Sequence, residues 1–244
     1  MKLLENSTLE ALSSRLSNAA IDCMMDFKLE AYSCKMVQSD KKQWKTVEDQ
    51  NVRQPLSPPD DFLSISASPI GHSARMRHLS EPSCSSSDND GDDGFKHQVL
   101  VDSISIRTLF DLRSVLDNAF PDYDFSTVKS DNFSLIPSYE DVTSMVNSRF
   151  FSTVNDYSLV REELWDSIEK EIEPYKCKIY GYKMDYGDDP FSEEGCIWAL
   201  VYFFYNKHLK RVLLFSCRAL SQSRAELSAD GLDFDTLDDD SEGY

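Results

Sequence analysis

The chain has 244 residues, of which 41% are hydrophobic and 28% charged, so it can form one ordinary domain with additional flexible parts. Its 43 acidic and 25 basic residues give a formal net charge of −18. Because nucleic-acid binding depends mainly on neutralising phosphates, we expect protein contacts and no direct contact with nucleic acid. No apolar run is long enough to span a bilayer or to act as a signal peptide. We therefore expect no membrane contact and a soluble protein in a reducing compartment.

The inventory of reactive side chains argues against an enzyme. The six cysteines form no Cys-x-x-Cys pair, so structural zinc is not expected. Cys196 and Cys217 lie in apolar runs and are interpreted as small core residues. Three of the four histidines lie in or beside a segment poor in large apolar residues, which cannot hold a general base against a substrate. His208 lies in a polar turn and is interpreted as solvated. Neither catalysis nor a cofactor is expected.

The first fifty residues predict a helix followed by a strand. Ser7 and Glu10 have the spacing of a capping box, and leucines then recur at helical intervals, which predicts a helix over residues 7–19. Residues 24–36 alternate well enough to predict a strand. Four residues are expected to share one side of this strand: Phe27, Leu29, Ala31 and Ser33.

Residues 51–95 differ in composition from the rest and are predicted to form a disordered linker. They contain few large apolar residues, a run of serines and the acidic stretch 88–94. A segment that cannot bury a core stays disordered. The tail, residues 222–244, is strongly acidic and is predicted to be disordered as well.

Three serines of the linker are candidate phosphorylation sites. Ser57 and Ser68 each precede a proline, which suits proline-directed kinases. Ser80 follows two arginines, five and three residues earlier, a spacing that suits the acidic pockets of basophilic kinases. The linker is thus predicted to be regulatory, and each phosphate would add about −1.5 to −2 charges at neutral pH.

Helical periodicity returns after the linker. It begins near Ile106 and is closed by Pro121, which cannot lie in a helix interior. A second helix is expected to open at Ser138, and a third is expected to end before Pro174.

The segment after these helices predicts a sheet. Residues 177–184 are expected to form a strand, and an acidic loop follows. Residues 196–205 and 212–217 are two apolar runs joined by a short polar and basic link, the pattern of a β-hairpin. Because both faces of the two strands are apolar, helices should cover the sheet on both sides.

These elements predict an α/β fold, as a single split domain. Residues 1–50 should dock onto residues 96–221, because neither piece has a complete core, and the N-terminal helix and strand should complete the sheet. The expected architecture is a sandwich, in which helices cover a mixed or antiparallel sheet. The disordered linker interrupts it and the acidic tail follows it. Strand order does not follow from the sequence.

Two groups of charged residues are candidate binding surfaces. Lys207, Lys210 and Arg211 form either a nuclear import or docking patch or merely the soluble end of a hairpin. The acidic loop over 185–194 lacks the spacing of a helix-loop-helix calcium site and is interpreted as solvated surface rather than a metal site.

Nine motifs in both predicted pieces carry a resemblance to a known family. They are MKLLENS (1–7), EAYSCKM (30–36), LSPP (56–59), TLF (108–110), PDYDFS (121–126), LW (164–165), DDPF (188–191), YFFYNKHLKR (202–211) and FSCR (215–218). In these motifs the sequence resembles the Maf-type negative regulators of RNA polymerase III. His208 departs from the family pattern and dilutes the positive charge of the turn.

The resemblance implies a non-catalytic repressor that binds RNA polymerase III and blocks its engagement with the promoter-bound initiation factor. It also implies that kinases inactivate the repressor by phosphorylating the linker, that a phosphatase reverses this, and that the protein moves between nucleus and cytoplasm. We hypothesise that acidic residues of two loops face the polymerase, because complementary charge speeds encounter. The candidates are Asp122, Asp124, Asp185, Asp188 and Asp189.

Two other functions remain open from the sequence. The chain could be a signalling adaptor whose phosphorylated linker recruits a phosphoserine-binding protein without any contact with the polymerase. It could also be a small-molecule sensor or an enzyme, which a buried pocket with converging polar groups would support.

Overall fold

The structure, a computed structural model, describes residues 1–47, 52–58, 102–183 and 189–222. Its helices in these ranges are α1 (Ser7–Asn18), α2 (Gln38–Thr46), α3 (Ile106–Ala119), α4 (Tyr139–Thr153) and α5 (Tyr157–Ile172), with 3-10 turns η1 (Ser130–Asn132) and η2 (Pro174–Lys176). Its strands are β1 (Lys2–Leu4), β2 (Met24–Ser33), β3 (Arg53–Pro55), β4 (Ser103–Ser105), β5 (Phe133–Ile136), β6 (Lys178–Tyr182), β7 (Cys196–Asn206) and β8 (Arg211–Leu220). No helix within the described ranges is long and apolar enough to cross a membrane.

The main sheet has six strands in the order β1-β2-β8-β7-β6-β5, and every neighbouring pair is antiparallel. The predicted hairpin is formed by β7 and β8. Strand β2 pairs with β8 from Met24↔Leu220 to Ser33↔Arg211, so the N-terminal strand completes the sheet as expected. Strands β3 and β4 form a separate two-stranded ribbon.

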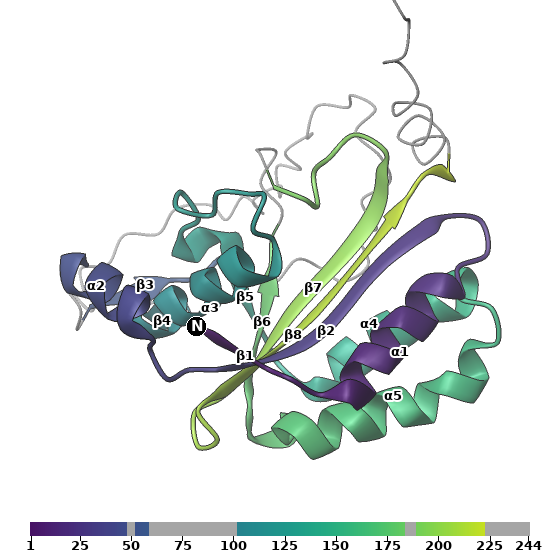
Figure 1. The fold of residues 1–244 in the computed structure, drawn as a ribbon, viewed down its shortest axis with the longest axis horizontal. Helices are drawn as coiled ribbons and strands as arrows, with labels where there is room; N and C mark the ends of the chain where they lie inside the picture. The colour runs from purple at the N-terminus through teal and green to yellow at the C-terminus, as the bar shows by residue number, and fades with distance from the viewer. Residues whose placement is uncertain (48–51, 59–101, 184–188, 223–244) are drawn as a thin grey trace, which may run out of the picture.

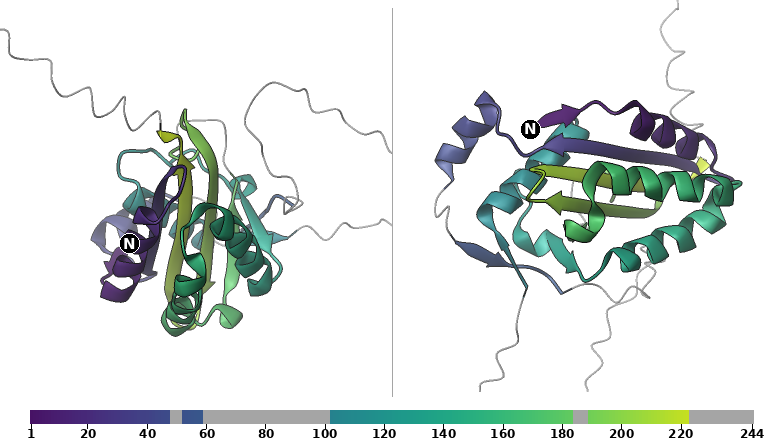
Figure 2. Two further views of the ribbon diagram at one scale, coloured as in Figure 1. Left: turned by 90° about the vertical axis from the view of Figure 1, so that its right-hand side faces the viewer. Right: turned by 90° about the horizontal axis from the view of Figure 1, so that it is seen from below.

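Helices cover both faces of the sheet, which confirms the predicted sandwich (Figure 1). Helices α1, α4 and α5 lie on one side of the long strands, and the view from below in Figure 2 shows them grouped together. Helix α3 lies on the other side. Alternate residues of β2 divide between the two cores: Phe27 and Leu29 join the α1–α4–α5 core, whereas Tyr32 joins the α3 core.

The helix boundaries follow their caps. Helix α4 begins as predicted, since the Ser138 side chain accepts a hydrogen bond from the Asp141 amide at 3.1 Å. Helix α1 begins at Ser7, as predicted, but its capping residue differs from the predicted one. Its cap is Asn6, whose side-chain oxygen accepts from the amides of Thr8 (3.0 Å) and Leu9 (3.4 Å), so Ser7 is already helical. Asparagine and serine cap helices about equally well, which explains the error.

The ordered structure extends further into the predicted linker than residue 51. Residues 53–55 form β3, and the side chain of Leu56 is buried in the α3 core. The Ser57 amide donates to the Phe133 carbonyl at 3.0 Å, at the edge of the sheet. The segment 52–58 therefore belongs to the folded domain rather than to the predicted linker, because it pairs with β4 and buries one leucine. Residues 59–101 and 223–244 lie outside the described residues.

Candidate functional site

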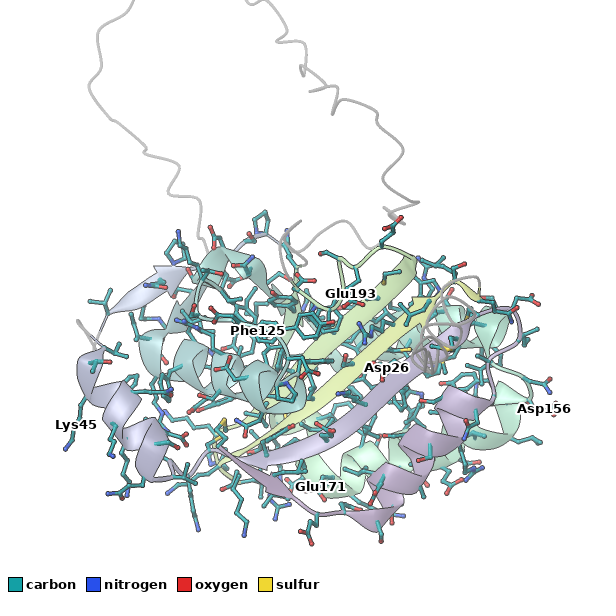
Figure 3. The ribbon with its side chains drawn as sticks, turned by 45° about the horizontal axis from the view of Figure 1, so that its top comes forward. Asp26, Lys45, Phe125, Asp156, Glu171 and Glu193 are labelled. Atoms are coloured by element: carbon teal, nitrogen blue, oxygen red, sulfur yellow. The ribbon has the colours of Figure 1, made fainter. Side chains whose placement is uncertain are left out.

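Three of the motifs meet around Arg218, near the end of β8. Its Nε donates to Asp26 Oδ2 at 2.9 Å, and its Nη1 donates to the Pro190 carbonyl at 2.6 Å and lies 3.3 Å from Glu193 Oε2. The Tyr123 hydroxyl donates to the other carboxylate oxygen of Glu193. Figure 3 shows Asp26 and Glu193 at this end of the long strands. We call these five residues the Arg218 cluster.

The charges of the Arg218 cluster hold it together. Burial alone would lower the pKa of Arg218, but its hydrogen bond to Asp26 and its other partners outweigh burial, so this pKa is raised. The pKa of Tyr123 is also raised, first by burial and then by its bond to Glu193. The single positive charge of Arg218 is thus shared between the carboxylates of Asp26 and Glu193, so the Arg218 cluster carries a net negative charge.

Aromatic side chains anchor the two loops that supply the cluster. Phe191 is buried, with its ring centroid 5.1 Å from that of Phe120 and 5.9 Å from that of Tyr182. The Lys28 ammonium lies 4.3 Å from the Phe120 ring centroid and donates to the Ala119 carbonyl at 2.7 Å. The loops are therefore fixed on the same face of the sheet as α3.

The acidic residues of the PDYDFS loop lie beside the cluster and are exposed. Asp124 accepts hydrogen bonds from the Ser126 amide (2.8 Å) and hydroxyl (3.0 Å), and these bonds lower its pKa. Asp122 is exposed as well. Charge at Asp122 can be changed without breaking a capping bond, whereas Asp124 also shapes its loop.

Asp189 is buried and does not form part of this acidic surface. Only 7% of it is exposed, and its Oδ1 accepts from the amides of Phe191 (2.9 Å) and Ser192 (2.8 Å). The hypothesis that Asp189 faces a partner is therefore wrong, because the carboxylate closes the turn that carries Phe191. Asp185 and Asp188 lie outside the described residues.

The basic turn between β7 and β8 lies at the other end of the hairpin. Arg218 lies seven positions after Arg211 on β8, which corresponds to about 23 Å along a strand. Lys207 and Lys210 are exposed, but Arg211 pairs with Glu171 of α5 at 2.8 Å. The three basic residues predicted to act together are therefore not equally available to a partner, because Arg211 is held in an ion pair.

The comparisons with known proteins agree on one family. The family model described as "Maf1 regulator" matches residues 25–216. This chain belongs to the Maf1 family. It is 32% identical to the "Repressor of RNA polymerase III transcription" of Dictyostelium discoideum, over 99% of this chain and 93% of that protein. It is 29% identical to "Repressor of RNA polymerase III transcription maf1" of Schizosaccharomyces pombe, over 97% and 90%. A crystal structure of citrus MAF1 matches with a TM-score of 0.56 and 26% identity, over 87% of this chain and 98% of that one.

The Maf1 membership confirms the predicted family and agrees with the predicted fold. Within the described ranges, no three His, Cys, Asp or Glu side chains are grouped so that they could hold a metal ion.

The resemblance pointed to PDYDFS, DDPF and FSCR as motifs, and the structure brings these motifs together around one arginine. The sequence did not predict the role of Asp26, because it is only one polar position in an alternating strand.

Of the three candidate phosphorylation sites in this Maf1 chain, only Ser57 lies in the described residues. Its hydroxyl donates to the main-chain carbonyl of Asp131 at 2.6 Å, and residue 57 bridges to Ser134 of β5. Ser57 therefore lies at the β5 edge of the sheet, two strands away from the β7–β8 hairpin. Ser68 and Ser80 lie outside the described residues.

Proposed function

We propose that this chain is a non-catalytic repressor of RNA polymerase III transcription, which binds the polymerase and blocks its engagement with the promoter-bound initiation factor. The observation that carries the proposal is the similarity to the Dictyostelium discoideum repressor, which extends over 99% of this chain. The similarity covers the described parts of both predicted pieces of the domain, so it includes every residue of the Arg218 cluster.

The charge of the chain supports binding to a basic protein surface. The formal net charge is −18, and the Arg218 cluster with Asp122 and Asp124 presents acidic groups at one end of the sheet. An acidic surface is repelled by nucleic acid but steers encounter with basic surfaces. We propose this end of the sheet as the polymerase-facing surface, with Asp185 and Asp188 as further candidates.

The proposed function includes control by phosphorylation. Kinases would modify Ser57, Ser68 and Ser80, and a phosphatase would restore repression. Phosphorylation would also shift the protein between nucleus and cytoplasm. For import, Lys207 and Lys210 are the better candidates, because the ion pair with Glu171 engages Arg211.

The first test is binding of the unphosphorylated chain to purified RNA polymerase III at two salt concentrations, with transcription of a transfer-RNA gene as the functional readout. We expect saturable binding, loss of transcription, and weaker binding at higher salt because salt screens exposed charges. Asp122→Lys should weaken binding about fivefold. Glu5→Lys is the matched control, since Glu5 is an exposed carboxylate near the other end of the sheet.

A folded chain that neither binds the polymerase nor lowers transcription would contradict the proposal. In that case a phosphorylation-dependent signalling adaptor becomes the better hypothesis. Deletion of residues 59–95 separates the two functions: an adaptor would lose its partner, whereas a repressor would still repress but would lose control by kinases.

A further inference from the structure

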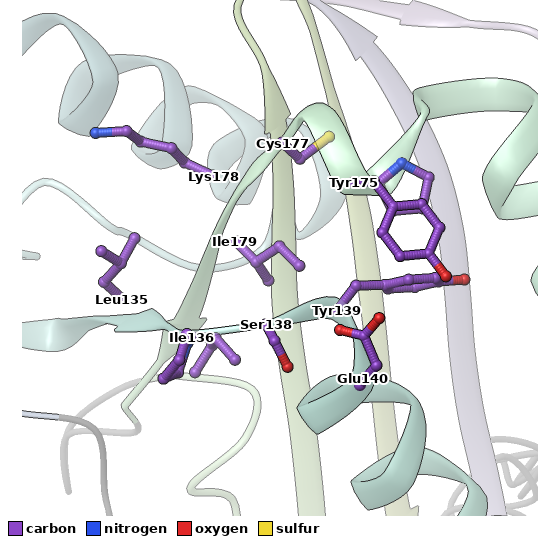
Figure 4. Close-up of a pocket in the computed structure, with 11 residues that line it drawn as sticks. Leu135, Ile136, Ser138, Tyr139, Glu140, Tyr175, Cys177, Lys178 and Ile179 are labelled. Carbon is purple, nitrogen blue, oxygen red and sulfur yellow. The ribbon is translucent and has the colours of Figure 1, made fainter.

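A pocket of about 290 Å³ opens at the edge of the sheet, between the end of β5, the first residues of α4 and the η2 turn (Figure 4). Its volume lies near the lower limit for small-ligand sites, which is roughly 300 Å³. It therefore suits a single side chain or a small molecule rather than a large cofactor. No member of the Arg218 cluster lines it.

Two tyrosines form an aromatic wall of this pocket. The ring centroids of Tyr139 and Tyr175 are 5.0 Å apart and the rings are nearly perpendicular, at 85°. Tyr139 is only 5% exposed and also packs against Trp165, with a centroid distance of 5.7 Å, whereas Tyr175 is 70% exposed. One ring is thus fixed in the protein and the other is open to solvent. The faces of such rings attract cations.

The Tyr139 hydroxyl is buried and has no hydrogen-bond partner among the described residues. Buried polar groups in folded proteins are normally paired. Tyr157, the first residue of α5, follows this rule, because its hydroxyl donates to Asn147 Oδ1 at 2.7 Å. The Tyr139 hydroxyl is therefore an unused hydrogen-bonding group in a residue that lines the pocket.

The charges that face Tyr139 are negative. Its pKa is raised first by burial, and the carboxylates of Glu169, Glu140 and Asp166 raise it further. Figure 4 shows the Glu140 carboxylate beside the Tyr139 ring. Glu140 lines the pocket from α4, whereas Glu169 and Asp166 of α5 act on Tyr139 without lining the pocket.

The nearby cations do not neutralise the tyrosine half of the pocket. Lys178 lines the pocket, but Figure 4 shows its amine directed away from the tyrosines. Lys176, on the η2 turn, forms an ion pair with Glu173. Ile136 and Ile179 form the apolar floor between the acidic side and Lys178.

We propose that this pocket binds the side chain of an arginine from a protein partner. The guanidinium would stack on the open Tyr175 ring and donate hydrogen bonds to the Tyr139 hydroxyl and the Glu140 carboxylate. Arginine fits better than lysine because its planar group both stacks on aromatic faces and donates in several directions. The aliphatic part of the arginine would lie on Ile136 and Ile179. This proposal does not rest on the repressor function, because any arginine-bearing protein segment of suitable shape would satisfy it.

The test is an NMR titration of the full chain, labelled at isoleucine methyl groups, with N-acetyl-arginine amide. We expect saturable shifts at Ile136 and Ile179, and no such shifts with N-acetyl-citrulline amide, which has nearly the same shape but no charge. Glu140→Gln and Tyr175→Ala should each weaken binding about fivefold.

Matched control variants change similar exposed side chains near the opposite end of α4. Asp22→Asn removes a carboxylate in a turn whose Ile21 amide bonds to Thr153, the last residue of α4. Phe151→Ala removes an aromatic ring that is 53% exposed. Both controls should bind the arginine probe like the wild type.

A second pair of variants tests the hydroxyl itself. Tyr139→Phe should weaken binding of the arginine probe without lowering the thermal midpoint, because the ligand-free protein loses no hydrogen bond. Tyr157→Phe should lower the midpoint, because it breaks the bond to Asn147. The proposal is overturned if N-acetyl-arginine amide gives no saturable shift or if the citrulline probe shifts the same methyl groups equally. Wild-type affinity in both Glu140→Gln and Tyr175→Ala would also overturn it.

Discussion

Arg218 on β8 and Asp26 on β2 lie opposite each other in the strand register, and their side chains form an ion pair with an Nε–Oδ2 distance of 2.9 Å. The two residues are 192 positions apart in the sequence. The pair therefore joins the two pieces of the split domain, on either side of the predicted linker. Because Arg218 also holds Glu193, it links both pieces to the loop that carries Phe191.

The first prediction concerns Arg218→Met, which keeps apolar volume but removes the charge. Asp26 and Glu193 would then lose their shared donor while remaining partly buried. We expect the free energy of unfolding to fall by about 2 kcal/mol, measured by urea denaturation. Lys207→Met, in the exposed turn, is the control and should change stability by less than about 0.5 kcal/mol. Equal effects of the two substitutions would show that the Arg218 cluster does not stabilise the fold.

The second prediction concerns the association of the two pieces. A protease site inserted after residue 58, within the predicted linker, should allow cleavage without dissociation. The reason is that β2 pairs with β8 along its whole length, and the Phe27 ring contacts the rings of Phe150 (5.8 Å) and Phe215 (5.0 Å) between centroids. Size-exclusion chromatography of the cut protein should give one species that contains both fragments.

Variants of β2 show whether packing causes this association. Phe27→Ala should cost about 3–5 kcal/mol and should release the fragments after cleavage. Met24→Ala lies on the same strand but at a residue that is 48% exposed, and it should leave the cut protein intact. Separation of the wild-type fragments would mean that the uncut chain, rather than its packing, keeps the domain together.

The long elements could be predicted because their patterns are strong. Helices α3, α4 and α5 repeat apolar residues at helical spacing, and the β7–β8 hairpin consists of two apolar runs. The sandwich followed from the apolar character of both faces of the hairpin. The order of the strands did not follow, since pairing of β2 with β8 depends on contacts between distant segments.

The short elements could not be predicted, because tertiary contacts decide them. Helix α2 has no apolar stripe; its single buried residue is Asp40, and Trp44 packs against Phe110 with a centroid distance of 5.3 Å. Strands β1 and β5 have only three and four residues. In the candidate site, the charge of Asp189 led to the prediction that this residue lies on the surface. An aspartate two residues before Phe191 can, however, be recognised as a residue that closes a turn.

The third prediction is a pH dependence that originates at Asp111. This carboxylate is 1% exposed, and burial raises its pKa to about 6 despite an ion pair with Arg107 at 3.1 Å and a hydrogen bond from Tyr205 at 3.2 Å. In the unfolded chain the same group loses its proton near pH 4. Between about pH 4 and 6 the folded state therefore binds more protons, so the contribution of Asp111 to stability falls as pH rises.

Asp111→Asn removes this titration and isolates its effect. A shift of about two pKa units corresponds to about 3 kcal/mol, so the stability of the wild type relative to Asp111→Asn should fall by up to that amount from pH 4 to pH 6. Urea denaturation of both proteins at several pH values measures the difference between their free energies of unfolding. The other carboxylates contribute equally in both proteins, so their contributions cancel in this difference. A difference that does not change with pH would show that Asp111 titrates alike in both states.

The fourth prediction concerns Ser57. A phosphorylated Ser57 could no longer donate its 2.6 Å hydrogen bond to the Asp131 carbonyl, and its charge would face that oxygen. The segment 52–58 should then loosen, and Leu56 should leave the α3 core. Hydrogen exchange reports this directly, because the Leu56 and Ser57 amides donate to the carbonyls of Asp102 (2.8 Å) and Phe133 (3.0 Å).

Two variants separate charge from the loss of a hydrogen bond at Ser57. Ser57→Ala removes the donor alone and should reduce protection of the two amides only slightly, since one hydrogen bond contributes about 1 kcal/mol. Ser57→Asp adds a negative charge beside the carbonyl and should reduce protection further. If both variants exchange like the wild type, the 52–58 segment does not depend on the Ser57 hydroxyl. Control by phosphorylation would then have to act through Ser68, Ser80 or another residue of the linker.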